Sequence, residues 1–343
     1  MCNDLINNIL KYKSISIIGT EKNTGKTETF NFCLKNLLKK SIKIAVTSIG
    51  VDGESVDIVT NTKKPEIELA ENVIFVTSEK HFREKKISAE ILNISKKSTS
   101  LGRLVTAKAH SCGKVILSGP SDTKWLKSVI DDMREMVDIT LIDGALSRKS
   151  LASPTITDAM ILNTGAALSA NINTLIKETK FLCNLINIPI FENEKLRLKL
   201  QNFQENFNNS SIWAIDNYLN INDLQIKSPL LIENHKNQLS SEKILYINGI
   251  ITNKILDFFR IQKNISERTI IVNDFTKIFV SPENLNYFEK AGGKIRVLNK
   301  TNLLAVCVNP TSPEGYILNT NELTKRMQEE LGIDVYDTRN VGS

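Results

Sequence analysis

The stretch Ile15-Ser16-Ile17-Ile18-Gly19-Thr20-Glu21-Lys22-Asn23-Thr24-Gly25-Lys26-Thr27 decides how this chain is interpreted. Its β-branched start predicts a buried strand, and the segment after the stretch, through Leu38, has a helical pattern. Between them lies a glycine-bounded loop that ends in Gly-Lys-Thr. A phosphate group requires several N–H donors, a helix N-terminus and a cation, and a loop in this position provides all three. The stretch therefore predicts a phosphate-binding loop.

The residues of this loop have separate expected roles. Gly25 allows the backbone to approach the phosphates, Lys26 is placed for the β- and γ-phosphates, and Thr27 offers a hydroxyl to Mg²⁺. The residues expected to contact the nucleotide are Gly19, Thr20, Asn23, Thr24, Gly25, Lys26, Thr27 and Glu28. We expect ATP with Mg²⁺ rather than GTP, because no Asn-Lys-x-Asp guanine signature is placed convincingly in the chain. Lys22 is expected to be solvated.

Acidic residues that follow other strands are candidates for the magnesium shell. Asp143 follows a buried run and is the first choice, with Lys26 as its catalytic partner. Asp52 and Glu54 lie in a glycine-flanked loop after another strand, and Asp52 is the second candidate for catalysis and for the metal. A solvated turn explains Asp52 and Glu54 equally well. The stretches at 118–121 and 163–165 follow further strands, and each is either a plain turn or a binding loop.

Short apolar runs alternate with helical patterns along the first half of the chain. This order predicts an α/β protein: a P-loop NTPase-type parallel sheet with flanking helices, plus a second, smaller α/β domain. One of the expected helices covers 101–111, because Leu101, Leu104, Val105 and Ala109 fall on one helical face. The expected domains are a nucleotide-binding domain at 1–190, a polar connecting segment at 191–240 and the smaller domain at 241–343. The last of these includes the strand LLAVCVN at 303–309 and a final helix.

The composition of the chain narrows the classes of function. The 343 residues carry a formal net charge of +6 and no dense basic block with interleaved aromatics, so a nucleic-acid partner is not expected. The five cysteines are odd in number and scattered, which favours a reducing, cytoplasmic compartment. No apolar run approaches the length of a membrane span, so no membrane partner is expected. The three histidines stand apart, so no metal other than magnesium is expected.

Five stretches together resemble the P-loop subunit of lysine 5,6-aminomutase reactivase. They are GTEKNTGKTET at 19–29, TSIGVDGES at 47–55, ILSGPSDTKWL at 116–126, IDGALSRKSLASPTITDAMILNTGAALS at 142–169 and CVNPTSPEGYILNT at 307–320. The resemblance implies a nucleotide-dependent chaperone that restores an adenosylcobalamin-dependent lysine 5,6-aminomutase, alongside a second ATPase reactivase subunit. It implies that Gly25, Lys26, Thr27 and Asp143 form the nucleotide site. A homodimer is a further assembly to be tested.

Two other functions remain open at this point. Five residues separate Gly19 from Gly25, one more than the standard spacing, and in this the loop resembles that of dethiobiotin synthetase. An enzyme of that kind would use ATP to activate a small carboxylate. The same loop would also serve a nucleotide sensor with little turnover.

Overall fold

The computed structural model describes residues 2–48, 66–120, 122–145, 156–203, 210–262 and 264–337. The chain forms two compact units. Unit 1 comprises Met1–Lys180 and Asn302–Ser343, and unit 2 comprises Phe181–Thr301. No helix in the described parts of the chain is long and apolar enough to cross a membrane.

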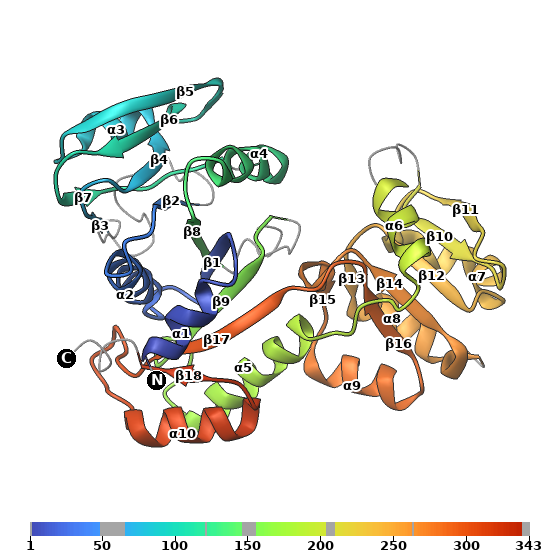
Figure 1. The fold of residues 1–343 in the computed structure, drawn as a ribbon. Coiled ribbons are helices and arrows are strands. Elements are labelled where there is room, and N and C mark those ends of the chain that lie inside the picture. The colour runs from blue at the N-terminus through green and yellow to red at the C-terminus, as the bar shows by residue number, and fades with distance from the viewer. Residues whose placement is uncertain are drawn as a thin grey trace. The chain divides into compact units, whose positions relative to one another are not determined.

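Unit 1 is built on a nine-stranded sheet in the order β18-β17-β9-β1-β8-β2-β4-β6-β5 (Figure 1). Its strands are β1 (Ser14–Gly19), β2 (Ile44–Ser48), β4 (Ile74–Ser78), β5 (Ala89–Thr99), β6 (Gly102–Ala109), β8 (Ile139–Ala145), β9 (Ala159–Gly165), β17 (Asn302–Asn309) and β18 (Val335–Tyr336). The strands from β18 to β4 are parallel, and β6 and β5 extend the sheet in antiparallel fashion. The predicted α/β class, with a large and mostly parallel central sheet, is confirmed.

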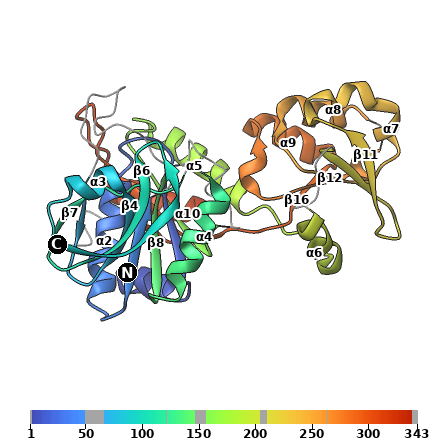
Figure 2. The same ribbon diagram turned by 90° about the horizontal axis from the view of Figure 1, so that it is seen from above.

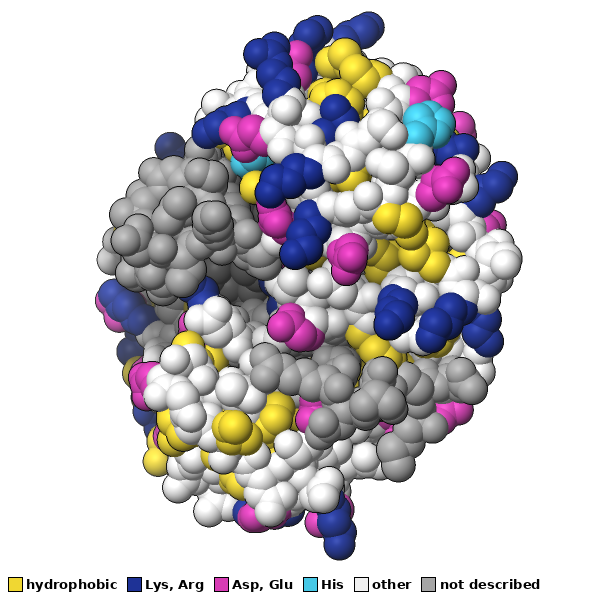
Figure 3. Space-filling model, turned by 90° about the vertical axis from the view of Figure 1, so that its left-hand side faces the viewer, with side chains coloured by type: hydrophobic (Ala, Val, Ile, Leu, Met, Phe, Trp, Pro, Cys, Tyr) yellow, Lys and Arg dark blue, Asp and Glu magenta, His cyan; other side chains and the backbone are white. Residues whose placement is uncertain are grey.

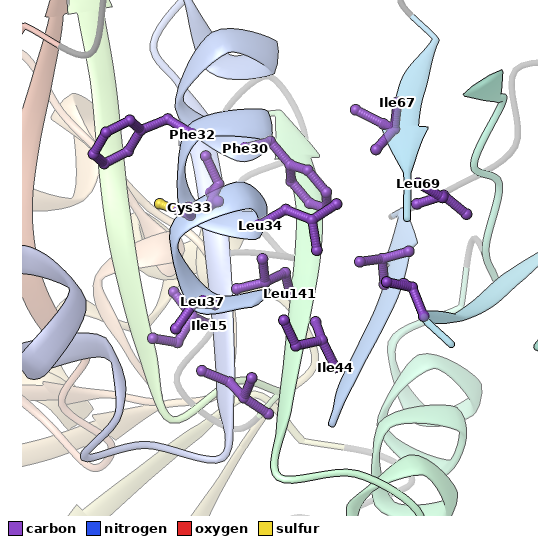
Figure 4. Close-up of a cluster of buried hydrophobic side chains, with 14 of the residues drawn as sticks. Ile15, Phe30, Phe32, Cys33, Leu34, Leu37, Ile44, Ile67, Leu69 and Leu141 are labelled. Carbon is purple, nitrogen blue, oxygen red and sulfur yellow. The ribbon is translucent and has the colours of Figure 1, made fainter. Parts of the chain in front are cut away.

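Helices cover both faces of this sheet, which explains why its central strands are apolar throughout. All residues of β1 and β9 are buried. On one face lie α1 (Cys2–Ile9) and α2 (Lys26–Leu38), and on the other lies α4 (Thr123–Arg134) (Figure 2). Figure 4 shows the core under α2, in which its buried side chains Phe30, Leu34 and Leu37 lie over Ile15 and Leu141. The helical spacing of these side chains is what aligns them toward the sheet.

The helix predicted at 101–111 is wrong, because residues 102–109 form the strand β6. Val105, Ala107 and Ala109 are buried in the core on one face of the sheet, whereas Leu104 belongs to the core on the other face. This alternation has a period of two residues, which is that of a strand. The spacing of positions 101, 105 and 109 fits both periods, and antiparallel pairing with β4 and β5 selects the strand.

The stretch KVILSG at 114–119, the run expected as a strand before the loop at 118–121, is not a strand of the main sheet. Only β7 (Gly113–Val115) is regular there, and it pairs with β3 (Ile67–Leu69) in a separate two-stranded sheet. The remaining α-helices in the described part of unit 1 are α3 (Glu79–Glu84), α5 (Ile172–Ile186), which continues into unit 2, and α10 (Thr320–Leu331). On the face of the molecule in Figure 3, Lys and Arg side chains are interspersed with Asp and Glu.

Unit 2 has a five-stranded sheet in the order β11-β10-β12-β14-β16. Its strands are β10 (Ile212–Ile215), β11 (Ile221–Ile226), β12 (Ile244–Ile247), β14 (Thr269–Val272) and β16 (Lys294–Val297). The strands β12, β14 and β16 are parallel and are connected through α8 (Asn253–Arg260) and α9 (Pro282–Lys290). Figure 2 shows α6 (Glu194–Phe203) on the face opposite α8 and α9. The parallel strands therefore lie between two helical layers.

The predicted domain limits are wrong in two places. Residues 191–240 were expected to connect two domains, but they contribute α6, β10, β11 and α7 (Lys236–Ser240) to unit 2. The strand β17 was expected in the smaller domain, but it pairs in parallel with β9 from Asn302↔Ala159 to Asn309↔Gly165. A run of apolar residues identifies a buried strand without identifying its sheet, so pairing over this distance in sequence was not predictable from the run alone.

Candidate functional site

The predicted phosphate-binding loop occupies residues 20–25, between the end of β1 and the start of α2. Gly25 is the N-cap of α2 and has a φ of 84°, which an L side chain rarely adopts. Asn23 has a φ of 62°, and the hydroxyl of Thr24 donates to the carbonyl of Glu21 at 2.9 Å. Because Gly25 has no side chain to cap the helix, the first N–H groups of α2 remain directed at the loop. The geometry suits a bound anion.

A cation and a carboxylate meet beside this loop. Asp143 of β8 lies opposite Ile17 of β1 in the sheet register. The Nζ atom of Lys26 lies 2.9 Å from Oδ1 of Asp143, and the two side chains are 24% and 19% exposed. The structure therefore brings together Lys26 and Asp143, which the sequence patterns placed in one site. Both groups retain access to solvent and to a ligand.

The structure also describes most of the other predicted contact residues. Thr27 is half-buried in the first turn of α2, and Glu28 after it is exposed. Thr20 is fixed at the start of the loop, because its N–H donates to the carbonyl of Asn163 at 2.8 Å. Gly19 is tightly packed, since a Cβ atom on it would lie 2.7 Å from Oγ1 of Thr24. Asp52 and Glu54 lie outside the described residues, so their predicted roles are not tested.

The end of β9, which the sequence left open as a turn or a binding loop, packs against the predicted phosphate-binding loop. Asn163 is completely buried. Its Nδ2 donates to the carbonyl of Ile18 at 3.2 Å, and its Oδ1 accepts a hydrogen bond from the hydroxyl of Thr29 in α2. These contacts join the strand before the loop to the helix after it. Asn163 therefore positions the loop from beneath.

Asn309 is a site residue that sequence reasoning missed. It ends β17 and is 5% exposed, and its Nδ2 donates to the carbonyl of Asn23 at 2.9 Å. A Cβ atom on Gly25 would lie 2.9 Å from Cβ of Asn309, so the glycine also makes room for this neighbour. Asn309 accepts through its own carbonyl from the N–H of Ala166 at 2.8 Å. The signals in the sequence were the Asn-Pro pair at the end of a buried strand and the position of Asn309 within the stretch at 307–320 that carries the resemblance.

The loop at 118–121 has a packing role in its described part. Ser118 is 2% exposed, and its hydroxyl accepts from the N–H of Ser78 at 2.8 Å and lies 3.0 Å from Nδ1 of His81. A Cβ atom on Gly119 would lie 1.9 Å from the carbonyl oxygen of Ser48, so only glycine fits there. These residues hold β2 and β4 together at the carboxyl edge.

The side chains near the loop can be compared with the ligands that a magnesium ion requires. Within the described ranges no group of three or more His, Cys, Asp or Glu side chains could by itself hold a metal ion. The hydroxyl of Thr27 and the carboxylate of Asp143 are hard oxygen donors, which fit Mg²⁺ when phosphate oxygens and water complete its shell. The residues present therefore fit magnesium as part of a nucleotide complex.

Comparison with known proteins does not assign this site. The chain matches no family model, and no curated protein matches it. Its ligand is therefore inferred from the geometry of the loop and its neighbours.

Proposed function

We propose that unit 1 is a P-loop nucleotide-binding domain that binds ATP with Mg²⁺ at residues 19–28. The observation that carries this proposal is the pairing of Lys26 with Asp143 at the start of a helix whose N-cap is Gly25. A phosphate group placed there would meet a helix N-terminus and an ammonium group together. Both lie at the carboxyl edge of parallel strands, where α/β proteins bind their ligands.

Different side chains of the proposed site contact the phosphates and the metal. With a nucleotide bound, Lys26 would pair with the β- and γ-phosphates in place of Asp143, and the carboxylate of Asp143 would be available to hold Mg²⁺. Mg²⁺ neutralises charge on the phosphates when it is bound, and Thr27 and Asp143 hold it, with Asp52 as the further candidate. This exchange gives the site two states that differ in the position of Lys26. Nucleotide binding at such a site can shift a conformational equilibrium, because it favours one of the two states.

The resemblance of five stretches to the reactivase P-loop subunit supports the finer proposal. The chain acts in the cytoplasm as the nucleotide-dependent subunit of a reactivase for an adenosylcobalamin-dependent lysine 5,6-aminomutase, together with a second ATPase subunit. A damaged cofactor held in a closed site dissociates slowly. Nucleotide binding can promote release of the cofactor only if the nucleotide-bound chain binds the open and closed states of the mutase with different affinities.

A reconstituted reaction tests this function. An aminomutase inactivated during turnover should regain activity with this protein, its partner ATPase, ATP, Mg²⁺ and fresh adenosylcobalamin, and omission of any component should prevent recovery. Lys26→Ala should fail in the same mixture. Lys35→Ala, which changes an exposed lysine on the same helix, should succeed.

Two results would overturn the proposal in different ways. Full recovery with Lys26→Ala would show that nucleotide binding at this loop does not drive reactivation. Conversion of a small carboxylate by the isolated protein with ATP would instead identify a synthetase of the dethiobiotin synthetase kind.

A further inference from the structure

Three neighbouring parallel strands of unit 2 run into asparagines at their carboxyl ends. Asn248 follows β12, Asn273 follows β14, and Asn299 follows β16 after one intervening leucine. The register of β12 with β14 continues to place Asn248 opposite Asn273. The N–H of Asn299 donates to the carbonyl of Asn273 at 2.9 Å. The three residues therefore form one row along the edge, which we call the amide row.

Side-chain hydrogen bonds join the amide row to its surroundings. Nδ2 of Asn273 donates to Oδ1 of Asn248 at 3.2 Å, and the hydroxyl of Tyr246 donates to Oδ1 of Asn273 at 2.6 Å. Nε2 of Gln201, from α6, donates to Oδ1 of Asn299 at 2.7 Å. These side chains, apart from the buried ring of Tyr246, are half-buried, so the row is ordered and still reachable.

Two polar atoms of this network are left without a partner among the described residues. One is a donor, Nδ2 of Asn248, and the other is an acceptor, Oε1 of Gln201. A primary carboxamide offers the complementary pair, because its carbonyl accepts and its NH₂ group donates. The side-chain hydrogen bonds described above are made by amides and one phenol. Their chemistry therefore favours a neutral ligand over a phosphate or a metal ion.

We propose that the amide row, with Gln201, binds a neutral ligand that carries primary carboxamide groups. The row lies at the carboxyl edge of parallel strands that are sandwiched between helices, which is where ligands bind in α/β sheets. Because β14 separates β12 from β16, one carboxamide of the ligand accepts from Asn248 and another donates to Gln201. This second site belongs to unit 2 alone and needs no nucleotide.

The first test uses propionamide as the probe and propionate as its charged counterpart. Side-chain amide resonances of the full chain, labelled with ¹⁵N, should shift with propionamide for Asn248 and Gln201 and stay in place with propionate. Absence of a shift with propionamide, or an equal shift with propionate, would overturn the carboxamide site. This test does not depend on the proposed function.

The second test uses cyanocobalamin, and this choice of probe rests on the proposed function, because the corrin ring of cobalamin carries carboxamide side chains. Calorimetric titration without nucleotide should show binding to the parent protein. Asn248→Asp keeps the acceptor used by Asn273 and removes the donor, so binding should weaken about tenfold. Asn237→Ala, at an exposed position of the same unit, should bind like the parent.

The outcomes separate this site from the proposed function. Shifts with propionamide and no binding of cyanocobalamin would keep the carboxamide site and reject cobalamin as its ligand. Cyanocobalamin binding that Asn248→Asp leaves unchanged would reject the assignment of the ligand to the amide row. Reactivation that proceeds normally with Asn248→Asp would uphold the proposed function and remove the amide row from it.

Discussion

Both units end neighbouring parallel strands in polar residues, yet the two carboxyl edges carry different chemical groups. In unit 1 the edge holds a glycine-bounded loop, a helix N-terminus and the ion pair of Lys26 with Asp143. In unit 2 it holds the amide row and a phenol. Similar layers of helix and sheet therefore present a charged site in one unit and a neutral one in the other. The difference lies in the residues that follow each strand, which is where sites differ among proteins of one fold class.

The largest expected effect concerns two cysteines that report on the packing of each unit. Burial raises the pKa of Cys307 in unit 1 and of Cys183 in unit 2 to about 12. At pH 8 both groups are neutral thiols, so alkylation should be roughly a thousandfold slower than at an ordinary exposed thiol. The exposed Cys112 provides that standard.

Alkylation followed by peptide mass spectrometry measures these rates. Because the pKa values are raised by folding, the thiols contribute stability that is complete below the ordinary pKa of 9.0 and is lost as the pH rises toward 12. Rapid labelling of Cys183 or Cys307 in the native protein at pH 8 would contradict the packing of the corresponding unit. The same assay shows whether a variant of either unit remains folded.

The second prediction removes the cation from the carboxyl edge of unit 1, so that this edge loses the charge that distinguishes it from the edge of unit 2. Lys26→Ala should weaken ATP binding about a hundredfold, because it removes charge-assisted hydrogen bonds to the phosphates. Isothermal titration with ATP and Mg²⁺ measures the loss, with Lys35→Ala as the matched control. An unchanged affinity in a folded Lys26→Ala protein would reject the nucleotide site.

The third prediction tests the support that β17 gives to the loop. Asn309→Ala removes the hydrogen bond to the carbonyl of Asn23, so the loop should be less well positioned and ATP affinity should fall about tenfold. Asn302→Ala, at the exposed start of the same strand, should have little effect. A thermal-shift titration with ATP compares the two, each against its own ligand-free transition. Equal shifts for both variants would assign Asn309 a purely structural role.

The sequence-based predictions of structure succeeded where a local pattern or a general rule of α/β sheets decides the outcome. The strand, loop and helix at 14–38 follow one another directly, and the position of Asp143 followed from the rule that ligand groups gather at the carboxyl edge. Asn309 was missed because 286 residues separate it from Asn23, and nothing in an apolar run states which sheet it joins. The error at 101–111 has another cause, since Leu104 and Val105 fit a helix until the pairing partners of β6 are known.

The amide row illustrates the same limit. Each of Asn248, Asn273 and Asn299 is an ordinary turn residue in the sequence. Only the parallel order of β12, β14 and β16 places them side by side. A functional cluster built from several strand ends becomes visible once the topology is known.

The last and smallest expected effect separates the metal from the phosphate contacts in unit 1. Asp143→Asn removes a carboxylate from the expected magnesium shell and also frees Lys26 from its ion pair. The first change weakens binding of the magnesium complex, and the second favours binding of ATP without metal. Most of the affinity for ATP should therefore remain, while the ratio of affinities with and without Mg²⁺ falls by about fivefold. Titrations with ATP in the presence of Mg²⁺ and in the presence of a chelator give this ratio directly. Asp132→Asn, an exposed aspartate of α4, controls for the loss of one negative charge. A ratio that is the same in Asp143→Asn and in the parent would remove Asp143 from the metal shell and leave it as the counter-ion of Lys26 alone.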